Sequence, residues 1–154
     1  MYPVITIICG LPKSGKTSYR KQHFADTLPV VDEAQFKADT SKTPYEQHKE
    51  VIDMVIERTV QELSTTGKDV IVEGCFVNPT DRRALIRRLK YYATLRCIYI
   101  KTPARLCMYR NNRTQNREVS NAVIRKLYSF TEINPSVNEG FQSVKIVENG
   151  KELK

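Results

Sequence analysis

The sequence lacks any hydrophobic run long enough to cross a membrane. A transmembrane helix needs about 20 consecutive apolar residues, and no run in the 154 residues approaches that length. The N-terminal residues also lack the basic segment followed by an apolar one that directs export. We therefore expect a cytoplasmic protein with no membrane partner.

Cysteine is also scarce. The four cysteines, Cys9, Cys75, Cys97 and Cys107, show no C-x-x-C spacing and no histidine partner, so the patterns typical of zinc and redox sites are missing. Cys9 and Cys97 fall in apolar segments predicted to be strands, and Cys75 follows another. We predict buried free thiols in preference to disulfides or metal ligands.

The composition is that of one globular domain with excess positive charge. A chain with 40% hydrophobic and 27% charged residues fits a single domain, residues 1–154, with a sizeable core. The formal net charge is +8, which favours a polyanionic partner over a small neutral metabolite. Because nucleotide-binding sites are themselves basic, the charge alone does not distinguish a nucleic acid from a nucleotide.

A phosphate-binding loop is the clearest motif in the chain. Residues 10–17 read Gly-Leu-Pro-Lys-Ser-Gly-Lys-Thr, a complete G-x-x-x-x-G-K-[ST] (Walker A) sequence between an apolar strand and a helix. The glycines let backbone N–H groups point into one concavity, Lys16 adds a charge for the β- and γ-phosphates, and the Thr17 hydroxyl is placed to ligate Mg²⁺. The predicted ATP-binding residues are Gly10, Leu11, Pro12, Lys13, Ser14, Gly15, Lys16, Thr17 and Ser18.

Strand and helix patterns alternate along the chain. Apolar runs predict strands at residues 3–9, 28–31, 69–73, 94–100 and 143–147. Helical spacing and caps predict helices at about 16–25 and 43–63, after 78, after 103 and at about 121–130, followed by a polar tail at about 149–154. Together with the phosphate loop, this order predicts a P-loop NTPase, an α/β fold whose five-stranded parallel sheet carries helices on both faces. Its ligands would bind at the carboxyl ends of the strands.

Carboxylates end two of the predicted strands. Asp32 and Glu33 follow the second strand, where a carboxylate would face the γ-phosphate and take the proton of an attacking hydroxyl. Because neighbours in an extended segment point to opposite faces, we expect only one of the pair to do so, and we predict Asp32 as catalytic. Glu73 ends the third strand and could hold Mg²⁺ or a substrate hydroxyl. The alternative for all three is an ordinary solvated or capping carboxylate.

Two basic clusters lie in the second half of the chain. The first contains Arg105, Arg110, Arg113 and Arg117. Placed after the fourth strand, it predicts a helical, arginine-rich lid at about residues 104–120 that closes over the triphosphate, with a solvated face as the alternative. The second cluster comprises Arg82, Arg83, Arg87, Arg88 and Lys90 with Tyr91 and Tyr92. We interpret it as a solvated helix face that could also contact phosphates.

From the phosphate loop to about residue 130, the order of features resembles the kinase domain of bacteriophage polynucleotide 5′-kinase and its small phosphate-loop relatives. The supporting segments are the loop, Asp32 with Phe36 and Lys37, Asn-Pro-Thr-Asp-Arg-Arg at 78–83, Arg-Asn-Asn-Arg at 110–113, and residues 119–128. The resemblance implies a P-loop NTPase of the kinase type and transfer of the γ-phosphate of ATP to a hydroxyl, with Mg²⁺. It implies phosphate contacts and catalytic roles for Lys16, Arg110 and Arg113. The predicted acceptor-binding residues are Glu33, Lys37, Glu73, Asn78, Arg83 and Arg117.

The segment at 31–37 departs from that family. Ala34 stands close to the position of the family's catalytic aspartate, and a small shift in alignment brings Asp32 into the role. Lys37 stands where the family has an arginine that touches the substrate phosphate. The same segment, Val-Asp-Glu-Ala-Gln-Phe-Lys, is similar to the zeta-toxin kinases, which phosphorylate a nucleotide sugar.

Three functions follow from these resemblances. The leading prediction is a kinase acting on DNA or RNA, at a 5′-hydroxyl end or at the hydroxymethyl group of a modified pyrimidine such as 5-hydroxymethyluracil in phage DNA. A phage-encoded enzyme of this kind would act in the host cytoplasm. The alternative is a small-molecule or nucleotide-sugar kinase of the zeta-toxin type. A non-catalytic nucleotide switch would need a segment that reports loss of the γ-phosphate, and no glutamine or threonine is obviously placed for that.

Overall fold

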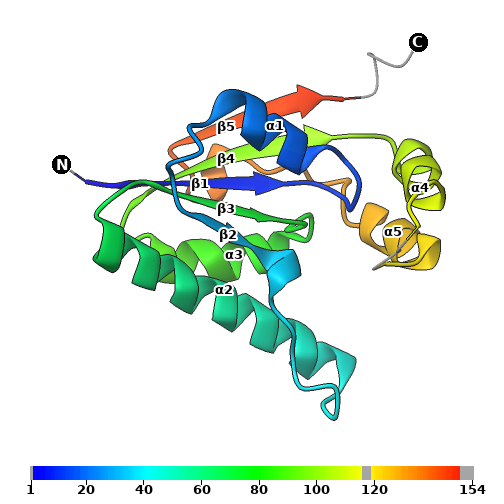
Figure 1. Cartoon of the computed structure of the whole chain (residues 1–154), viewed down its shortest axis with the longest axis horizontal. Helices are drawn as coiled ribbons and strands as arrows, with labels where there is room; N and C mark the ends of the chain where they lie inside the picture. Colours follow the sequence, from blue (N-terminus) through cyan, green and yellow to red (C-terminus); the bar gives the residue numbers. More distant parts are fainter. Residues whose placement is uncertain (1, 116–118, 150–154) are drawn as a thin grey trace.

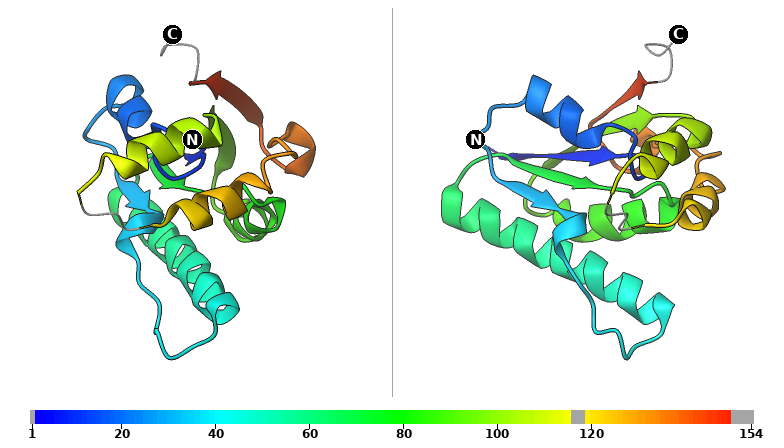
Figure 2. Two further views of the ribbon diagram at one scale, coloured as in Figure 1. Left: turned by 90° about the vertical axis from the view of Figure 1, so that its right-hand side faces the viewer. Right: turned by 45° about the vertical axis from the view of Figure 1, so that its right-hand side comes forward.

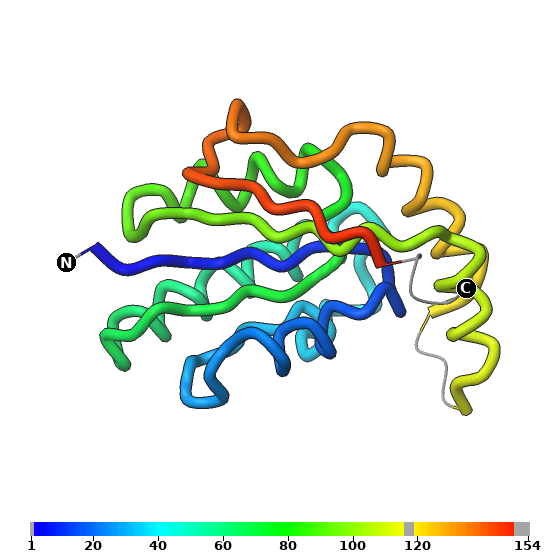
Figure 3. The backbone as a smooth tube through the Cα atoms, turned by 90° about the horizontal axis from the view of Figure 1, so that it is seen from above, coloured from blue at the N-terminus to red at the C-terminus, as the bar shows by residue number. Residues whose placement is uncertain are grey.

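The sheet consists of parallel strands with β1 at its centre. The computed structural model describes residues 2–115 and 119–149. The strands lie in the order β2-β3-β1-β4-β5 (Figures 1 and 3), and their bounds are β1 Val4–Cys9, β2 Val30–Asp32, β3 Val70–Gly74, β4 Thr94–Lys101 and β5 Ser143–Glu148. Every neighbouring pair is parallel, which confirms the predicted sheet. The loop after β1 therefore opens at the middle of the carboxyl edge.

Helices cover both faces of the sheet, as predicted. α1 (Lys16–His23) lies on one face, whereas α2 (Pro44–Thr66) and α3 (Pro79–Leu89) lie on the other (Figures 1 and 2). α4 (Ala104–Asn112) and α5 (Asn121–Tyr128) pack together at the carboxyl ends of the strands. One 3₁₀ turn, η1 (Glu33–Gln35), follows β2, and a second, η2 (Val137–Glu139), precedes β5. Across the two described ranges, every helix is too short or too polar to span a membrane.

The local sequence explains where α2 and α3 begin. Thr43 and Asn78 accept hydrogen bonds through their side chains from the backbone N–H groups of Glu46 and Thr80. Proline is the first residue of both helices, where its missing N–H costs nothing. α2 ends at Gly67, whose φ of 67° suits a left-handed cap. These caps fix the first turns of both helices at the carboxyl edge of the sheet.

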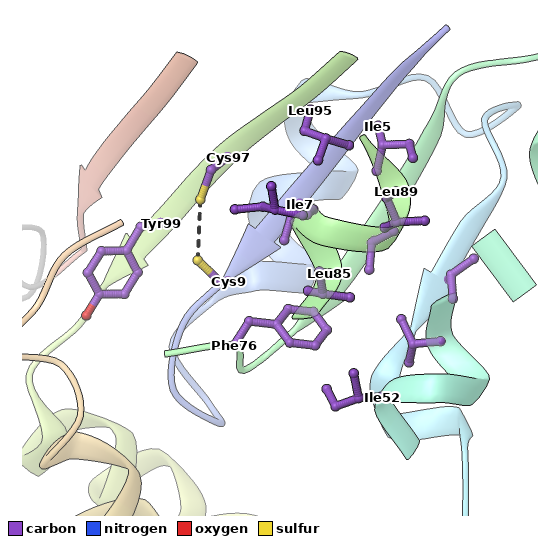
Figure 4. Close-up of a cluster of buried hydrophobic side chains, with 14 of the residues drawn as sticks. Ile5, Ile7, Cys9, Ile52, Phe76, Leu85, Leu89, Leu95, Cys97 and Tyr99 are labelled. Carbon is purple, nitrogen blue, oxygen red and sulfur yellow. Dashed lines mark hydrogen bonds between the residues drawn. The ribbon is translucent and has the colours of Figure 1, made fainter. Parts of the chain in front are cut away.

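Apolar side chains fill the space between the sheet and the helices. The larger cluster, which includes Ile7 of β1 and Leu85 of α3, lies on the α2–α3 side (Figure 4). A smaller cluster of Ile8, Ile71 and Ile100 lies on the other face, against Tyr19 of α1 and Phe24, which follows that helix. Because successive residues of β1 point to opposite faces, this mainly apolar strand supplies both clusters.

The four cysteines are free, as predicted. Cys9, Cys97 and Cys107 are buried and Cys75 is half-buried. The sulfur atoms of Cys9 and Cys97 lie 3.7 Å apart on neighbouring strands (Figure 4). Burial raises the pKa of Cys75 and of Cys107 to about 11. Both thiols therefore stay protonated at neutral pH and behave as small apolar side chains.

The structure corrects the prediction for Arg82, which is fully buried and not part of a solvated face. Its guanidinium donates to the backbone carbonyls of Phe76 and Val77 at 3.0 and 2.9 Å. It also forms two hydrogen bonds of 2.9 Å with the carboxylate of Glu139. The reason is helical spacing, since Arg82 lies one turn before Leu85 on the stripe of α3 that faces the core. The predicted solvated stripe begins one residue later.

Candidate active site

The loop after β1 forms the phosphate-binding side of the site. Gly15 adopts a φ of 104° at the start of α1, a conformation rarely adopted by residues with a side chain. At Gly10, a Cβ atom would lie 2.7 Å from the backbone oxygen of Ile100. Lys16 folds over the loop, and its Nζ donates to the carbonyl oxygens of Gly10 and Leu11 at 2.8 and 2.9 Å. The loop thus curls around an ammonium group, which suits phosphate binding.

Side chains from later in the chain hold this loop in place. Thr102 and Asn149 both donate to the carbonyl oxygen of Ser14, at 2.8 and 2.6 Å. Asn149 was expected to begin a polar tail, and the structure places it against the loop instead. Arg110 of α4 donates to the carbonyl oxygen of Lys13 at 2.9 Å. The predicted lid therefore brings one guanidinium to the phosphate-binding side.

Glu73, at the end of β3, is bound to the first turns of α1. Its Oε2 accepts a hydrogen bond of 2.6 Å from the Thr17 hydroxyl, and its Oε1 accepts one of 2.9 Å from Nε of Arg20. The side chain is nearly fully buried. β3 lies between β1 and β2, and Glu73 pairs in register with Asp32 of β2. The two strand-end carboxylates therefore lie side by side, next to the loop.

Asp32 and Glu33 both line the cavity beside the loop, so the alternation expected of this pair does not hold. β2 ends at Asp32, whose Oδ1 caps η1 by accepting a hydrogen bond of 3.0 Å from the N–H of Ala34. Glu33 already belongs to that turn, and its Oε1 accepts one of 3.1 Å from the N–H of Cys75. Burial raises the pKa of both carboxyls, and the nearby Glu73 adds to the effect on Asp32. Both are therefore easier to protonate than ordinary carboxylates.

A histidine–carboxylate pair that the sequence analysis did not single out lies across the cavity. Nε2 of His48, on α2, is 2.9 Å from both carboxylate oxygens of Asp81, on α3. The hydrogen bond to Asp81 raises the pKa of His48 above its ordinary value. A signal for His48 exists in the sequence, since it precedes Val51 and Ile52 by three and four residues on the inner stripe of α2.

One cavity of about 850 Å³ joins these groups. Its acidic lining comes from Asp32, Glu33, Glu73 and Asp81, and its basic lining from Lys13, Lys16, Lys37 and Arg110. An apolar wall lies beside the carboxylates, formed by Phe36, Val51, Val77, Val123 and Leu127. The cavity therefore has a phosphate-binding side and a side lined by carboxylates and apolar residues.

The side chains of several predicted site residues do not line the cavity. The side chain of Leu11 packs in the core, although its carbonyl accepts from Lys16 in the loop, and Ser18 is exposed on α1. The amide oxygen of Asn78 caps α3, and Arg83 is exposed on that helix. Arg113 is also exposed, and its guanidinium lies over the ring of Tyr109, 5.5 Å from the centroid. Arg117 lies outside the described residues.

Comparison with known structures shows the same fold. The sugar kinase from Janibacter sp. HTCC2649 has a TM-score of 0.72 at 13% identity, over 96% of this chain and 86% of that one. A chain of the PezAT toxin–antitoxin system of Streptococcus pneumoniae has a TM-score of 0.61 at 16% identity, over 96% and 68%. A chain of the Pnkp1/Rnl/Hen1 RNA repair complex has a TM-score of 0.67 at 18% identity, over 85% of this chain. This chain spans only 44% of the length of that last relative.

Sequence comparison gives the family. No curated protein is significantly similar in sequence. Residues 5–132, most of the chain, match the AAA domain family AAA_33. This match includes the phosphate loop, β1 to β4, and the helices α1 to α5. Together with the parallel sheet and the curled loop after β1, it shows that the chain belongs to the AAA_33 family and has the fold of a P-loop kinase.

Proposed function

We propose that the chain is a kinase that transfers the γ-phosphate of ATP to a hydroxyl group of DNA or RNA, with Mg²⁺ as cofactor. The observation that carries this proposal is the single cavity in which the phosphate loop faces the carboxylates of two neighbouring strands. Phosphoryl transfer depends mainly on positioning and on neutralising charge, with little covalent chemistry for the protein to perform. The carboxylate side of the cavity suits positioning of the acceptor, and the loop side suits neutralisation of the phosphate charge.

The loop side would bind the triphosphate. Lys16 lies within the curl of the loop, and Arg110 reaches it from α4, so both cations are placed to neutralise charge on the transferring group. Thr17 and Glu73 would hold Mg²⁺, which neutralises the β- and γ-phosphates when bound. Their oxygens lie 2.6 Å apart, and hard oxygen donors beside a phosphate site are the ligands that Mg²⁺ prefers.

The opposite side would hold the acceptor hydroxyl. Asp32 neighbours Glu73 in the sheet and lines the same cavity as Lys16, so its carboxylate can orient the hydroxyl and take its proton. Burial and the nearby Glu73 raise the pKa of Asp32, which makes it a stronger base than an ordinary aspartate. Glu33 already accepts a hydrogen bond from the backbone of Cys75, and we assign it to the wall of the acceptor pocket.

Charge supports a nucleic-acid acceptor. The net charge of +8 favours a polyanion, and Lys37 lines the cavity with an ammonium group that can contact an acceptor phosphate. The similarity of fold to a chain of an RNA repair complex agrees with this class of acceptor. A 5′-hydroxyl end and a hydroxymethyl group on a modified pyrimidine both present the primary alcohol that the chemistry requires.

A second candidate is a kinase for a sugar or another small alcohol. It is favoured by the carboxylates of Glu33 and Asp81 in the acceptor pocket, because such groups bind neutral hydroxyls better than phosphates. The sugar kinase with the same fold also matches over most of both chains.

The test is to incubate the protein with Mg²⁺, ATP labelled in the γ-phosphate, and a panel of acceptors. The panel contains oligonucleotides with 5′-hydroxyl ends, DNA containing 5-hydroxymethyluracil, free nucleosides, and simple sugars. We expect label in one of the nucleic acids and none with the Lys16→Ala variant. Label confined to sugars would establish the second candidate, and hydrolysis of ATP without any labelled acceptor would contradict both.

A measurement of affinity against salt separates the two classes independently. Each phosphate neutralised by the protein releases a counterion, so binding of an oligonucleotide should weaken steeply as salt rises. A small neutral acceptor should show almost no such slope. A flat plot for oligonucleotides would overturn the nucleic-acid assignment.

A further inference from the structure

A second groove lies between α2 and α3, at the end of the helices away from the active-site cavity. Its volume is about 490 Å³. Ile56, Glu57 and Val60 of α2 form one side, and the other is formed by Arg87, Arg88, Tyr91 and Tyr92. The second side coincides with the basic cluster that the sequence analysis interpreted as a solvated face. We refer to this hollow as the Arg–Tyr groove.

Two large aromatic rings are exposed at the Arg–Tyr groove. Tyr91 is 71% exposed and Tyr92 is 50% exposed. The Nζ of Lys90 lies 5.2 Å from the centroid of the Tyr91 ring, so a cation and a π-face are adjacent at the same edge. Exposed aromatic faces beside cations are the features on which unpaired bases stack.

Of the two guanidinium groups that line the Arg–Tyr groove, one is paired with a carboxylate and the other is not. Arg88 is paired with Asp53 at 2.8 Å. Arg87, on the neighbouring position of α3, is exposed and has no hydrogen-bonding or ionic partner among residues 2–115 and 119–149. Glu57 is the acidic residue of the groove. Arg83, one turn before Arg87, is also exposed and continues the cationic stripe toward the active site.

Residues of the same two helices, α2 and α3, line both the Arg–Tyr groove and the active-site cavity. α2 and α3 both run back from the carboxyl edge of the sheet and pack against each other (Figure 2). The His48–Asp81 pair bridges them at the cavity, and Arg88–Asp53 bridges them further along. Glu57 lies nine residues after His48 in α2, which is a rise of about 14 Å. That distance corresponds to about four base steps of a stacked strand with the spacing found in duplex DNA.

We propose that the Arg–Tyr groove binds single-stranded nucleic acid, namely the part of the acceptor strand that extends beyond the nucleotide held in the cavity. The proposal rests on the proposed function. Tyr91 and Tyr92 stack with bases, and Arg87 contacts a phosphate. A nucleic acid suits this surface better than a protein partner because its unpaired groups are cationic and aromatic, and those two features complement phosphates and bases.

The test compares three variants with the wild-type protein by fluorescence anisotropy, using a two-nucleotide and a twelve-nucleotide single strand. Tyr92→Leu removes the ring but keeps an apolar side chain, and we expect about fivefold weaker binding of the long strand. Tyr92→Phe keeps the ring and should bind as the wild type does. Arg87→Gln should reduce the slope of log affinity against log salt by about 1. Lys21→Gln, an exposed cation on α1, is the matched control and should leave the slope near that of the wild type.

Phosphate transfer is measured on the same strands. We expect Tyr92→Leu and Arg87→Gln to raise KM for the long strand and to leave transfer to the short strand unchanged. Binding that depends on the groove, without transfer to any strand, would overturn the proposed function and support the groove. Transfer with identical binding by all variants would overturn the groove alone. If Tyr92→Leu binds the long strand as well as Tyr92→Phe does, the groove is not a stacking site and fits an apolar protein partner instead.

Discussion

The hydroxyl of Thr17 and the carboxylate of Glu73 are joined by a hydrogen bond of 2.6 Å, although 56 residues separate them in the chain. The bond connects the end of the phosphate loop to the end of β3. It places a hydroxyl and a carboxylate together where the cofactor of a phosphoryl transfer would bind. Glu73, which pairs in register with Asp32, therefore links the loop to the end of β2.

We expect Glu73→Gln to raise the Mg²⁺ concentration needed for half-maximal transfer by about tenfold or more. The amide keeps the shape of the side chain but removes the negative charge that a cation requires. The measurement is a titration with Mg²⁺ at saturating ATP. Glu62→Gln, on the far part of α2, is the control and should leave the titration unchanged. An unchanged titration for Glu73→Gln would place the metal elsewhere.

Lys16→Ala should abolish transfer and leave the fold intact. Its Nζ lies within the loop, and loss of such charge stabilisation commonly costs about 3 kcal/mol or more, which is a rate loss of several hundredfold. Initial rates and thermal unfolding of the same sample check both parts. Lys13→Ala is the control, because that side chain is exposed and its carbonyl, not its ammonium, is bound to Arg110. Normal turnover by the Lys16 variant would contradict the assignment of the loop.

Asp32→Asn should bind ATP normally but lose transfer by about 10²–10⁴-fold, as expected for removal of a general base. Glu33→Gln should be milder, because a glutamine oxygen can still accept the hydrogen bond from Cys75. Transfer rates and nucleotide affinity are measured for both. If Glu33→Gln is the inactive variant, the roles of the two carboxylates are exchanged. If both remain active, the acceptor is activated without either.

Arg82→Leu should destabilise the protein by about 3–5 kcal/mol. The substitution leaves the Glu139 carboxylate and the backbone carbonyls of Phe76, Val77 and Ile133 without the guanidinium that satisfies them. Urea unfolding measures the change. Arg83→Leu is the matched control one residue along the same helix, and its exposed side chain should contribute less than about 0.5 kcal/mol. Equal effects of the two substitutions would contradict the structural role of Arg82.

His48 should make stability depend on pH. The hydrogen bond to Asp81 raises the pKa of His48 in the folded state, so its contribution is fully present below the unfolded pKa of about 6.5 and is lost as the pH rises through the folded value. Because the side chain is half-exposed, we expect at most about 1 kcal/mol. Urea unfolding of wild type and His48→Gln at pH 5.5 and pH 9 should differ more at pH 5.5. An equal difference at both values would exclude the charged pair.

The sequence predicted the sheet well because its signals are local. The central strands β1, β3 and β4 are mainly apolar, and Gly15, Thr43 and Asn78 mark where the neighbouring helices begin. The predicted strand ends lie within two residues of the observed ones. This includes β2, which extends one residue beyond its apolar run, to Asp32. The motif also identified Lys16 and Thr17 directly.

The parts of the site that the sequence did not reveal depend on tertiary packing. The turn that starts at Glu33 rotates this side chain into the cavity, and an alternating strand pattern cannot show where such a turn begins. The His48–Asp81 pair joins two helices whose mutual orientation is set only by packing. Arg82 was predicted to be solvated because of its residue type, although its spacing from Leu85 places it on the buried stripe of α3.

The buried pairing of Arg82 with Glu139 has a consequence for how the protein is made. Glu139 follows Arg82 by 57 residues, so a ribosome would complete it about 3–11 s later. Until then the Arg82 guanidinium lacks the carboxylate with which it is paired in the core. The backbone at Phe76 and Val77, whose carbonyls accept hydrogen bonds from Arg82, therefore cannot adopt its final conformation. The phosphate loop lies much earlier in the chain. Thr102 and Asn149, which hold that loop, also come after Arg82, so both sides of the cavity would be complete only after Asn149 has been added.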